Sequence, residues 1–246
     1  LFKFIRKLLS KIIIKDLINP SNINLAANYI YTQDIEGDYL EFGCFRGESF
    51  IESYFNINKS EKFWMSEKRK KKAFTDNYDE LPIYKKNYNR RFLAFDSFAG
   101  LPKPKKIDSD HPLFREGRYD CSKEEFIKII KKANLNLNRI ELIDGFYEQS
   151  LTVEIKKKLK IDKAAIIMID CDYYDSTVFV LRFITDLIQN GTIIIFDDWY
   201  NYKANPRKGE QLACSEWLEE NPNIELIEYG NNLLTQKMFI VNLRSS

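Results

Sequence analysis

Acidic side chains gather where apolar runs of strand length end in this 246-residue chain. In an open parallel sheet the carboxyl ends of the strands meet at one edge, and ligands bind at that edge. Carboxylates crowded there repel one another unless a cation or a cationic ligand lies among them. The sequence therefore predicts a site for a positively charged ligand. The acids concerned are Glu41, Asp96, Asp144, Asp170, Asp172, Asp197 and Asp198.

Three of these acids have the spacing of a metal site. Asp170 ends one apolar run, and Asp197 and Asp198 end the next, with a helix-like segment at 176–190 between the two runs. If the runs are neighbouring parallel strands, the three carboxylates lie side by side. Ligation by oxygen alone favours a hard cation such as Mg²⁺ or Ca²⁺. The alternative is that one or two of these acids cap helices or interact with arginine.

A glycine turn, LEFGCFRGES, follows the first apolar run. Gly43 and Gly47 allow a ligand close to the backbone, but the motif is not the dinucleotide G-x-G-x-x-G, and it lacks the lysine of a P-loop. Glu41 favours a ligand amine, and Asp96, at the end of the second run, suits the hydroxyls of a ribose. An amine together with a ribose indicates S-adenosylmethionine. A purely structural turn is the alternative.

Seven apolar runs alternate with helix-like segments and would position these acids. Several runs are continuously apolar, which is typical of strands buried on both faces of a parallel sheet. The alternation predicts an α/β fold: a Rossmann-like, seven-stranded, mostly parallel sheet with helices on both faces. The expected strands are 38–44, 91–98, 139–145, 164–172, 192–199, 223–230 and 237–243. The expected helices are 47–56, 122–133, 150–160, 176–190 and 208–220.

Composition narrows the class of protein. A net charge of +2 argues against a dedicated nucleic-acid binder, which carries a strong basic excess. The four cysteines form no C-x-x-C pair, which argues against a zinc site or a disulfide framework and favours a cytoplasmic protein. The apolar runs are all shorter than the roughly 20 residues that span a bilayer, so we expect no transmembrane segment.

We expect one methyltransferase-sized domain over residues 1–246. Residues 1–37 are expected to form an N-terminal helical segment, whose basic amphipathic start either packs on the domain or lies on a membrane surface. Residues 57–90 are interpreted as an insertion. Residues 99–121 form a long irregular segment of the kind that is usually functional, here an acceptor or lid loop. A homodimer is possible through residues 1–37 or 57–90.

Five segments resemble successive motifs of the macrocin O-methyltransferase (TylF/MycF-like) family of class I S-adenosylmethionine-dependent methyltransferases. The resemblance covers about residues 38–200, and its most specific motifs are D-S-F-x-G-L-P at 96–102 and D-x-D-x-Y-x-S-T at 170–177. It implies the class I methyltransferase fold, methylation of a sugar hydroxyl, and dependence on Mg²⁺. The segments are LEFGCFRGES, AFDSFAGLP, IDGFYEQSL, MIDCDYYDSTVFVL and GTIIIFDDW.

The resemblance also implies residue roles. The glycine turn would hold the methionine part of S-adenosylmethionine, the end of the second strand its ribose, and the end of the third its adenine. Asp170, Asp197 and Asp198 would bind the metal, and Asp170 is also the candidate general base. The expected cofactor contacts are Glu41, Gly43, Phe45, Gly47, Ser49, Asp96, Ser97, Asp144, Gly145, Phe146 and Asp170.

The acceptor side is less constrained by these patterns. His111, the single histidine, is an alternative base or acceptor contact, or else a solvated loop residue. Arg115 could contact the phosphate of a nucleotide-linked sugar or remain solvated. Tyr173, Tyr174 and Trp199 could line the substrate pocket or simply pack.

The leading hypothesis is a Mg²⁺-dependent O-methyltransferase acting on a nucleotide-activated sugar used in surface (capsular) polysaccharide biosynthesis. The same site could instead methylate a catechol-like molecule or a natural-product glycoside. A third hypothesis is a catalytically inactive domain that binds the cofactor or a partner.

Overall fold

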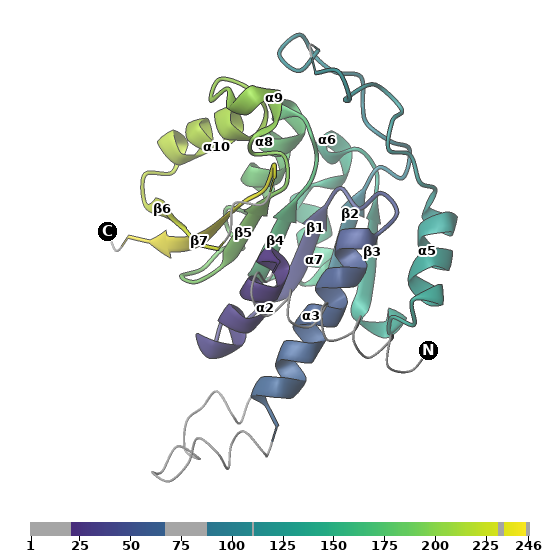
Figure 1. Ribbon diagram of the computed structural model, residues 1–246, viewed down its shortest axis with the longest axis vertical. Helices are drawn as coiled ribbons and strands as arrows, with labels where there is room; N and C mark the ends of the chain where they lie inside the picture. The colour runs from purple at the N-terminus through teal and green to yellow at the C-terminus, as the bar shows by residue number, and fades with distance from the viewer. Residues whose placement is uncertain (1–20, 67–87, 110, 231–233, 245–246) are drawn as a thin grey trace, which may run out of the picture.

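A seven-stranded sheet forms the centre of the protein, in the strand order β3-β2-β1-β4-β5-β7-β6 (Figure 1). The computed structural model describes residues 21–66, 88–109, 111–230 and 234–244. Strand β7 is antiparallel to its neighbours on both sides, and the pairs among β1 to β5 are parallel. The predicted α/β fold with a mostly parallel sheet is therefore confirmed. The strands are β1 (Asp38–Phe42), β2 (Phe92–Asp96), β3 (Ile140–Asp144), β4 (Ala164–Ile169), β5 (Ile193–Phe196), β6 (Ile224–Glu228) and β7 (Lys237–Leu243).

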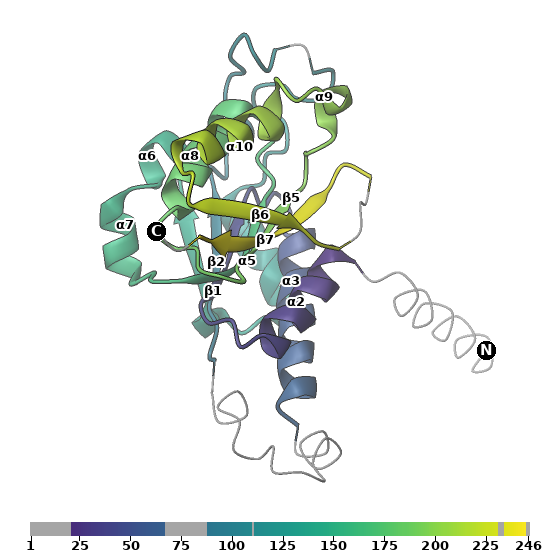
Figure 2. The ribbon, with the colours of Figure 1, turned by 90° about the vertical axis from the view of Figure 1, so that its left-hand side faces the viewer.

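Helices cover both faces of this sheet (Figure 2). One apolar cluster joins α2 (Asn22–Thr32), α3 (Glu48–Trp64) and α5 (Lys123–Lys132) to one face. The other face packs against a second cluster that holds the remaining long helices. Burial on both faces explains why the strand sequences are continuously apolar rather than alternating. The second layer comprises α6 (Tyr147–Ser150), α7 (Val153–Leu159), α8 (Tyr174–Ile184) and α10 (Gly209–Glu220), and α9 (Asn201–Ala204) lies near its edge.

Helix α3 runs eight residues beyond the expected end at 56. Ile57 and Ser60 are buried and continue the face that Phe50 and Tyr54 turn toward the sheet, so the helical period persists. Residues 57–64 therefore belong to a helix that packs on the sheet, and the interpretation of 57–90 as an insertion stays a prediction. Residues 67–87 of that segment, and residues 1–20 of the expected N-terminal helical segment, lie outside the described residues.

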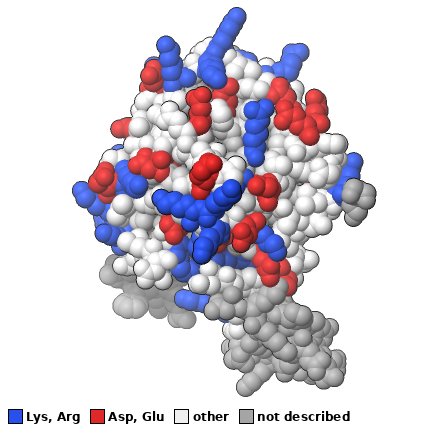
Figure 3. Space-filling view, turned by 180° about the vertical axis from the view of Figure 1, so that it is seen from behind, with Lys and Arg blue, Asp and Glu red and all other residues white. Residues whose placement is uncertain are grey.

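The expected helix at 150–160 is two helices, α6 and α7. The hydroxyl of Thr152 accepts a hydrogen bond from the backbone N–H of Ile155 at 3.2 Å, which makes Thr152 the N-cap of a new helix. Across the described residues, no helix is both long and apolar enough to cross a membrane. Basic and acidic side chains lie interspersed on the face shown in Figure 3, in keeping with the small net charge.

Candidate active site

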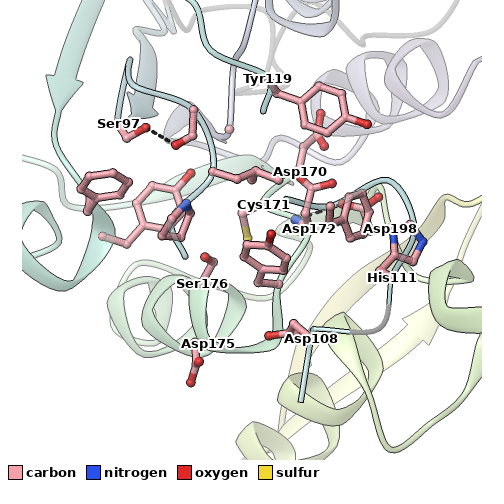
Figure 4. Close-up of a pocket in the computed structure, with 18 of the residues that line it drawn as sticks. Ser97, Asp108, His111, Tyr119, Asp170, Cys171, Asp172, Asp175, Ser176 and Asp198 are labelled. Atoms are coloured by element: carbon pink, nitrogen blue, oxygen red, sulfur yellow. Dashed lines mark hydrogen bonds between the residues drawn. The ribbon is translucent and has the colours of Figure 1, made fainter. Parts of the chain in front are cut away.

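A cavity of about 600 Å³ lies at the carboxyl ends of the parallel strands. This volume is in the range of sites that bind small molecules. Strand ends, the 97–119 loop and the start of α8 line it. In Figure 4, Asp170 and Asp198 lie between Ser97 on one side and His111 on the other. The carboxylates therefore lie between two parts of the cavity.

The predicted carboxylate trio is present. Asp170, Asp197 and Asp198 each place an oxygen within 4.8 Å of the other two. The juxtaposition arises because β4 and β5 are adjacent and parallel, and α8 connects them. Burial raises the pKa of all three carboxyls, and repulsion among them raises those of Asp170 and Asp198 further, with Asp198 reaching about 7. The site therefore concentrates buried negative charge that a cation would offset.

The surroundings of the trio fit a hard divalent cation. The side-chain amide of Gln236 donates to Asp197 Oδ1 at 2.5 Å, and that of Asn201 donates to Asp198 Oδ1. These neutral donors orient the carboxylates without neutralising them, as the partners of metal ligands do. The oxygen-only, negatively charged donor set suits Mg²⁺ better than a softer metal.

Glu210, on α10, holds the backbone of Asp198 in place. Its Oε2 accepts the backbone N–H of Asp198 at 3.0 Å, and its side chain is 1% exposed. Burial raises the pKa of Glu210 well above its usual range, and the charge of Asp198 adds to the effect. Glu210 therefore fixes the peptide that carries one of the predicted ligands.

We expect Glu210→Ala to lower the free energy of unfolding by about 1–3 kcal/mol, because it leaves the buried N–H of Asp198 unsatisfied. Glu210→Gln keeps an acceptor and removes a buried acid, so its stability at pH 8 should equal or exceed that of the wild type. Urea unfolding of the three proteins measures the difference. Equal losses in both variants would contradict this role for the hydrogen bond.

The glycine turn is tied to the end of β2 through Asp96. Asp96 Oδ2 accepts the backbone N–H groups of Cys44 and Phe45 at 2.7 and 3.0 Å, and Oδ1 accepts that of Phe98 at 2.7 Å. Phe45 and Phe98 have φ of 42° and 50°, unusual values for residues with side chains. Such strain concentrates where a ligand site needs a fixed backbone. Asp96 and Ser97 line the cavity, and their role as ribose contacts stays a prediction.

Other expected cofactor contacts lie around the turn rather than along the cavity. Glu41 is 0% exposed, and it accepts hydrogen bonds from the hydroxyls of Tyr39 and Ser49, the latter at 2.7 Å. Burial raises the pKa of Glu41 to about 8. Neither Glu41 nor Ser49 lines the cavity, and a Cβ on Gly47 would meet the ring of Phe126. Glu41, Gly47 and Ser49 therefore lie on the core side of the turn, whereas Gly43 and Phe45 line the cavity.

Of the three residues expected at the adenine end, Phe146 lines the cavity and Asp144 and Gly145 do not; Tyr147 and Glu148, which follow Phe146, line it as well. Asp144 is exposed and pairs with Lys123, with 3.6 Å between Oδ2 and Nζ. The backbone N–H of Gly145 donates to the carbonyl of Asp96 at 3.0 Å. The β3 end therefore contributes an aromatic wall and a backbone link.

Two expected substrate contacts lie at the cavity and three do not. His111 and Tyr173 line it. The Tyr174 hydroxyl instead donates to Glu216, and Arg115 is exposed outside the cavity.

Trp199 packs away from the site, with ring centroids 5.0 Å from Phe196 and 5.1 Å from Phe239. The interpretation of Trp199 as a substrate contact is therefore not supported by its position. Because it follows Asp198 directly, the turn after β5 directs the two side chains to different sides.

Several cavity residues had no assigned role in the sequence. Asp172 was noted only as one acid in the row, yet it lines the cavity beside the trio with a φ of 61°. Its backbone N–H donates to Asp198 Oδ2 at 3.1 Å. Asp108 and Tyr119 come from the irregular loop, where no periodic pattern marks them. The D-x-D spacing was the available signal for Asp172.

Residues 80–215 match the profile of a family described as Macrocin-O-methyltransferase (TylF). The match spans more than half of the chain. The chain belongs to the macrocin O-methyltransferase family. The match contains the D-S-F-x-G-L-P and D-x-D-x-Y-x-S-T motifs and the carboxylate trio, whereas the glycine turn precedes it. Membership makes the protein an S-adenosylmethionine-dependent O-methyltransferase.

Solved structures share the fold. The O-methyltransferase NovP has 18% sequence identity and a TM-score of 0.63, covering 92% of this chain and 78% of its own. CalS11, a calicheamicin methyltransferase, has 17% identity and a TM-score of 0.63, covering 92% and 79%. An O-methyltransferase from Bacillus cereus in complex with SAH has 14% identity and a TM-score of 0.52, covering 90% and 81%. No curated protein matches the sequence. The class I methyltransferase fold is thus confirmed.

Proposed function

We propose that the protein transfers the methyl group of S-adenosylmethionine to a sugar hydroxyl, with Mg²⁺ held by Asp170, Asp197 and Asp198. The observation that carries this proposal is the trio of carboxylates that converge between the two ends of the cavity. Family membership supports the cofactor, and CalS11, also described as a TDP-rhamnose 3'-O-methyltransferase, supports a sugar acceptor by analogy. Family membership and the intact trio count against an inactive binding domain.

The chain's residues would divide the work between the two ends. Asp96 and Ser97 would bind the ribose hydroxyls, and Phe146 would pack on the adenine. The glycine turn, fixed by Asp96, would place the methionine part toward Asp170. The main demand on the protein is positioning, because the sulfonium already activates the methyl group.

Proton removal is the second demand, since a sugar hydroxyl is a weak acid. A divalent cation in the trio would make a bound hydroxyl more acidic and stabilise the developing negative charge. Asp170, the base expected from the sequence, belongs to the trio and would direct its oxygens to the cation. Asp172 lines the same cavity outside the trio, and we assign the proton to its carboxylate. His111 packs flat on Phe114 and serves better as a wall.

A nucleotide-linked acceptor fits the rim of the cavity. Lys103 and Lys105 line it on the 99–121 loop, where they could meet a phosphate in place of Arg115. Lys105 already pairs with Asp175 at 3.2 Å, so a phosphate would compete with that carboxylate.

We propose a cytoplasmic role in methylating nucleotide-activated sugars for surface polysaccharide, carried out by a single domain with 99–121 as its acceptor loop.

The test is a methyl-transfer assay with labelled S-adenosylmethionine and Mg²⁺. The acceptors are nucleotide-activated hexoses and deoxyhexoses, methyl glycosides and catechols, with products detected by mass spectrometry. We expect turnover with a saccharide and little or none with catechols. Preferential methylation of a catechol would replace the sugar proposal, and binding of S-adenosylmethionine without turnover on any acceptor would favour a binding domain.

A further inference from the structure

The loop between β2 and α5 brings a buried carboxylate to the His111 end of the cavity. Asp108 lines the cavity, and its side chain is 0% exposed. Its Oδ1 accepts the backbone N–H of Tyr174, the first residue of α8, at 3.2 Å. Its Oδ2 accepts no hydrogen bond of good geometry among the described residues, although the hydroxyl of Tyr202 lies near enough to interact with the carboxylate. One oxygen therefore caps a helix, and the other keeps a lone pair for a further donor.

Capping alone does not explain an aspartate at this position. Asparagine or serine would accept the same N–H without a buried charge. Burial raises the pKa of Asp108 to about 6, while the hydrogen bonds from the N–H of Tyr174 and the hydroxyl of Tyr202 oppose the rise. A buried carboxylate oxygen that lacks a hydrogen bond of good geometry destabilises the fold. Such an atom calls for an explanation beyond stability, and a ligand group that pairs with it supplies one.

An aromatic wall stands beside Asp108. The ring of His111 stacks on Phe114 with 3.7 Å between centroids, and both rings line the cavity. The ring of Tyr202 packs against both, with its centroid 4.8 Å from that of His111 and 5.9 Å from that of Phe114. A sugar presents hydroxyl groups and an apolar C–H face. A carboxylate can accept hydrogen bonds from the hydroxyl groups, and neighbouring aromatic rings can pack on the C–H face.

The backbone that holds this wall is strained. Tyr202, Lys203 and Ala204 have φ of 54°, 58° and 55°, a left-handed turn that residues with side chains avoid. The hydroxyl of Tyr202 donates to the carbonyl of Asp172 at 3.4 Å. Strain of this kind persists where the surroundings enforce it for function. The turn therefore links the aromatic wall to the acid that we assign as proton acceptor.

We propose that Asp108 determines acceptor specificity: its Oδ2 accepts a hydrogen bond from a sugar hydroxyl other than the one methylated, while His111 and Phe114 pack on the sugar ring. This inference rests on the proposed function and names the residues that select the acceptor. In Figure 4, His111 lies across the carboxylates from Ser97, and Asp108 lies below the carboxylates near the start of α8, so both are apart from the cofactor end of the cavity.

The test compares Asp108→Asn with the wild type on the saccharide that the wild type methylates fastest. Asparagine keeps an oxygen for the N–H of Tyr174 and replaces Oδ2 with a donor. Losing a hydrogen bond to a charged group should raise the acceptor KM about tenfold or more. We expect kcat within about threefold, unchanged affinity for S-adenosylmethionine and an equal or higher Tm. Glu116→Gln, an exposed acid of the same loop, is the matched control.

A deoxy analogue of the acceptor identifies the hydroxyl. For the analogue that lacks it, wild type and Asp108→Asn should have equal KM values. Asp108→Ala should show the raised KM together with a lower Tm, since it also removes the helix cap.

An unchanged acceptor KM in Asp108→Asn would overturn the inference and leave Asp108 as a cap only. A wild type that methylates no saccharide would instead defeat the proposed function, a failure visible before any variant is made, and the inference would fall with it.

Discussion

Replacing Asp198 with asparagine should lower kcat about 100- to 1,000-fold while the metal-free protein becomes more stable. Asparagine keeps one oxygen for the N–H of Asp172. The side-chain amide of Asn201 can flip to accept a hydrogen bond from the new NH2 group, so the local fold should survive. The loss of one anionic ligand removes electrostatic stabilisation of the reacting oxygen, and single contributions of that kind reach this size. EDTA should abolish wild-type turnover, and added Mg²⁺ should restore it.

The stability gain follows from the raised pKa of Asp198. Burial and the charge of Asp197 raise it to about 7, whereas an unfolded carboxyl ionises near pH 4. The unfolded state therefore releases this proton first, and the folded state loses stability as the pH rises from about 4 to 7. Asparagine removes this loss. At pH 8 without metal, we expect Asp198→Asn to melt a few degrees above the wild type, since 1 kcal/mol moves Tm by roughly 2–4 °C.

Adding Mg²⁺ should reverse that order. A cation that binds only the folded protein stabilises it by mass action, and the wild type should gain more than the variant. Asp162→Asn removes an exposed acid just before β4 and should change neither activity nor the response to Mg²⁺. Full activity of Asp198→Asn, or a wild type indifferent to both EDTA and Mg²⁺, would show that the trio does not bind a catalytic metal.

The sequence predicted most reliably those features that depend on long periodic patterns. All seven apolar runs became strands, because each is apolar enough to be buried by helices on both faces. The carboxylate trio followed from topology alone. A helix between two strands most often places them side by side and parallel, as α8 does for β4 and β5, so Asp170 was expected to lie beside Asp197 and Asp198.

What the sequence could not supply was the direction of side chains after a strand ends. Asp198 and Trp199 are neighbours in the chain, yet one joins the trio and the other packs on Phe239. Glu41 was expected to reach a ligand, but its carboxylate accepts hydrogen bonds from the hydroxyls of Tyr39 and Ser49. Turn geometry after a strand depends on tertiary contacts rather than on spacing.

The irregular loop was the hardest part to interpret. Asp108 has no periodic context, and only its burial against the start of α8 distinguishes it from the other acids of the loop. The length of 99–121 nevertheless indicated function, and this segment supplies the His111 end of the cavity. Sequence could locate the acceptor loop without identifying its contacts.

Gly43→Ala should disrupt both the cofactor end and the trio. Gly43 has a φ of +87°, and a Cβ there would stand 1.7 Å from the backbone oxygen of Asp170. The carbonyl belongs to the chain leaving β4, so the ends of β1 and β4 would have to separate. Separation moves Asp170 away from Asp197 and releases the turn that Asp96 holds.

We expect Gly43→Ala to lose about 3 kcal/mol or more of folding free energy, combining left-handed strain with overpacking. Affinity for S-adenosylmethionine should fall at least about tenfold, and turnover should fall further because Asp170 also shifts. Gly117→Ala separates the two causes: Gly117 has a φ of +73°, but an added Cβ meets nothing within 4 Å, so it should lose only about 1–2 kcal/mol. Scanning calorimetry measures the stability of each variant, and titration calorimetry measures its affinity for S-adenosylmethionine. Equal losses of folding free energy in the two variants would show that backbone strain alone matters and that β1 and β4 tolerate a methyl group between them. The close approach of Gly43 to Asp170 would then not be what holds the two ends of the site together.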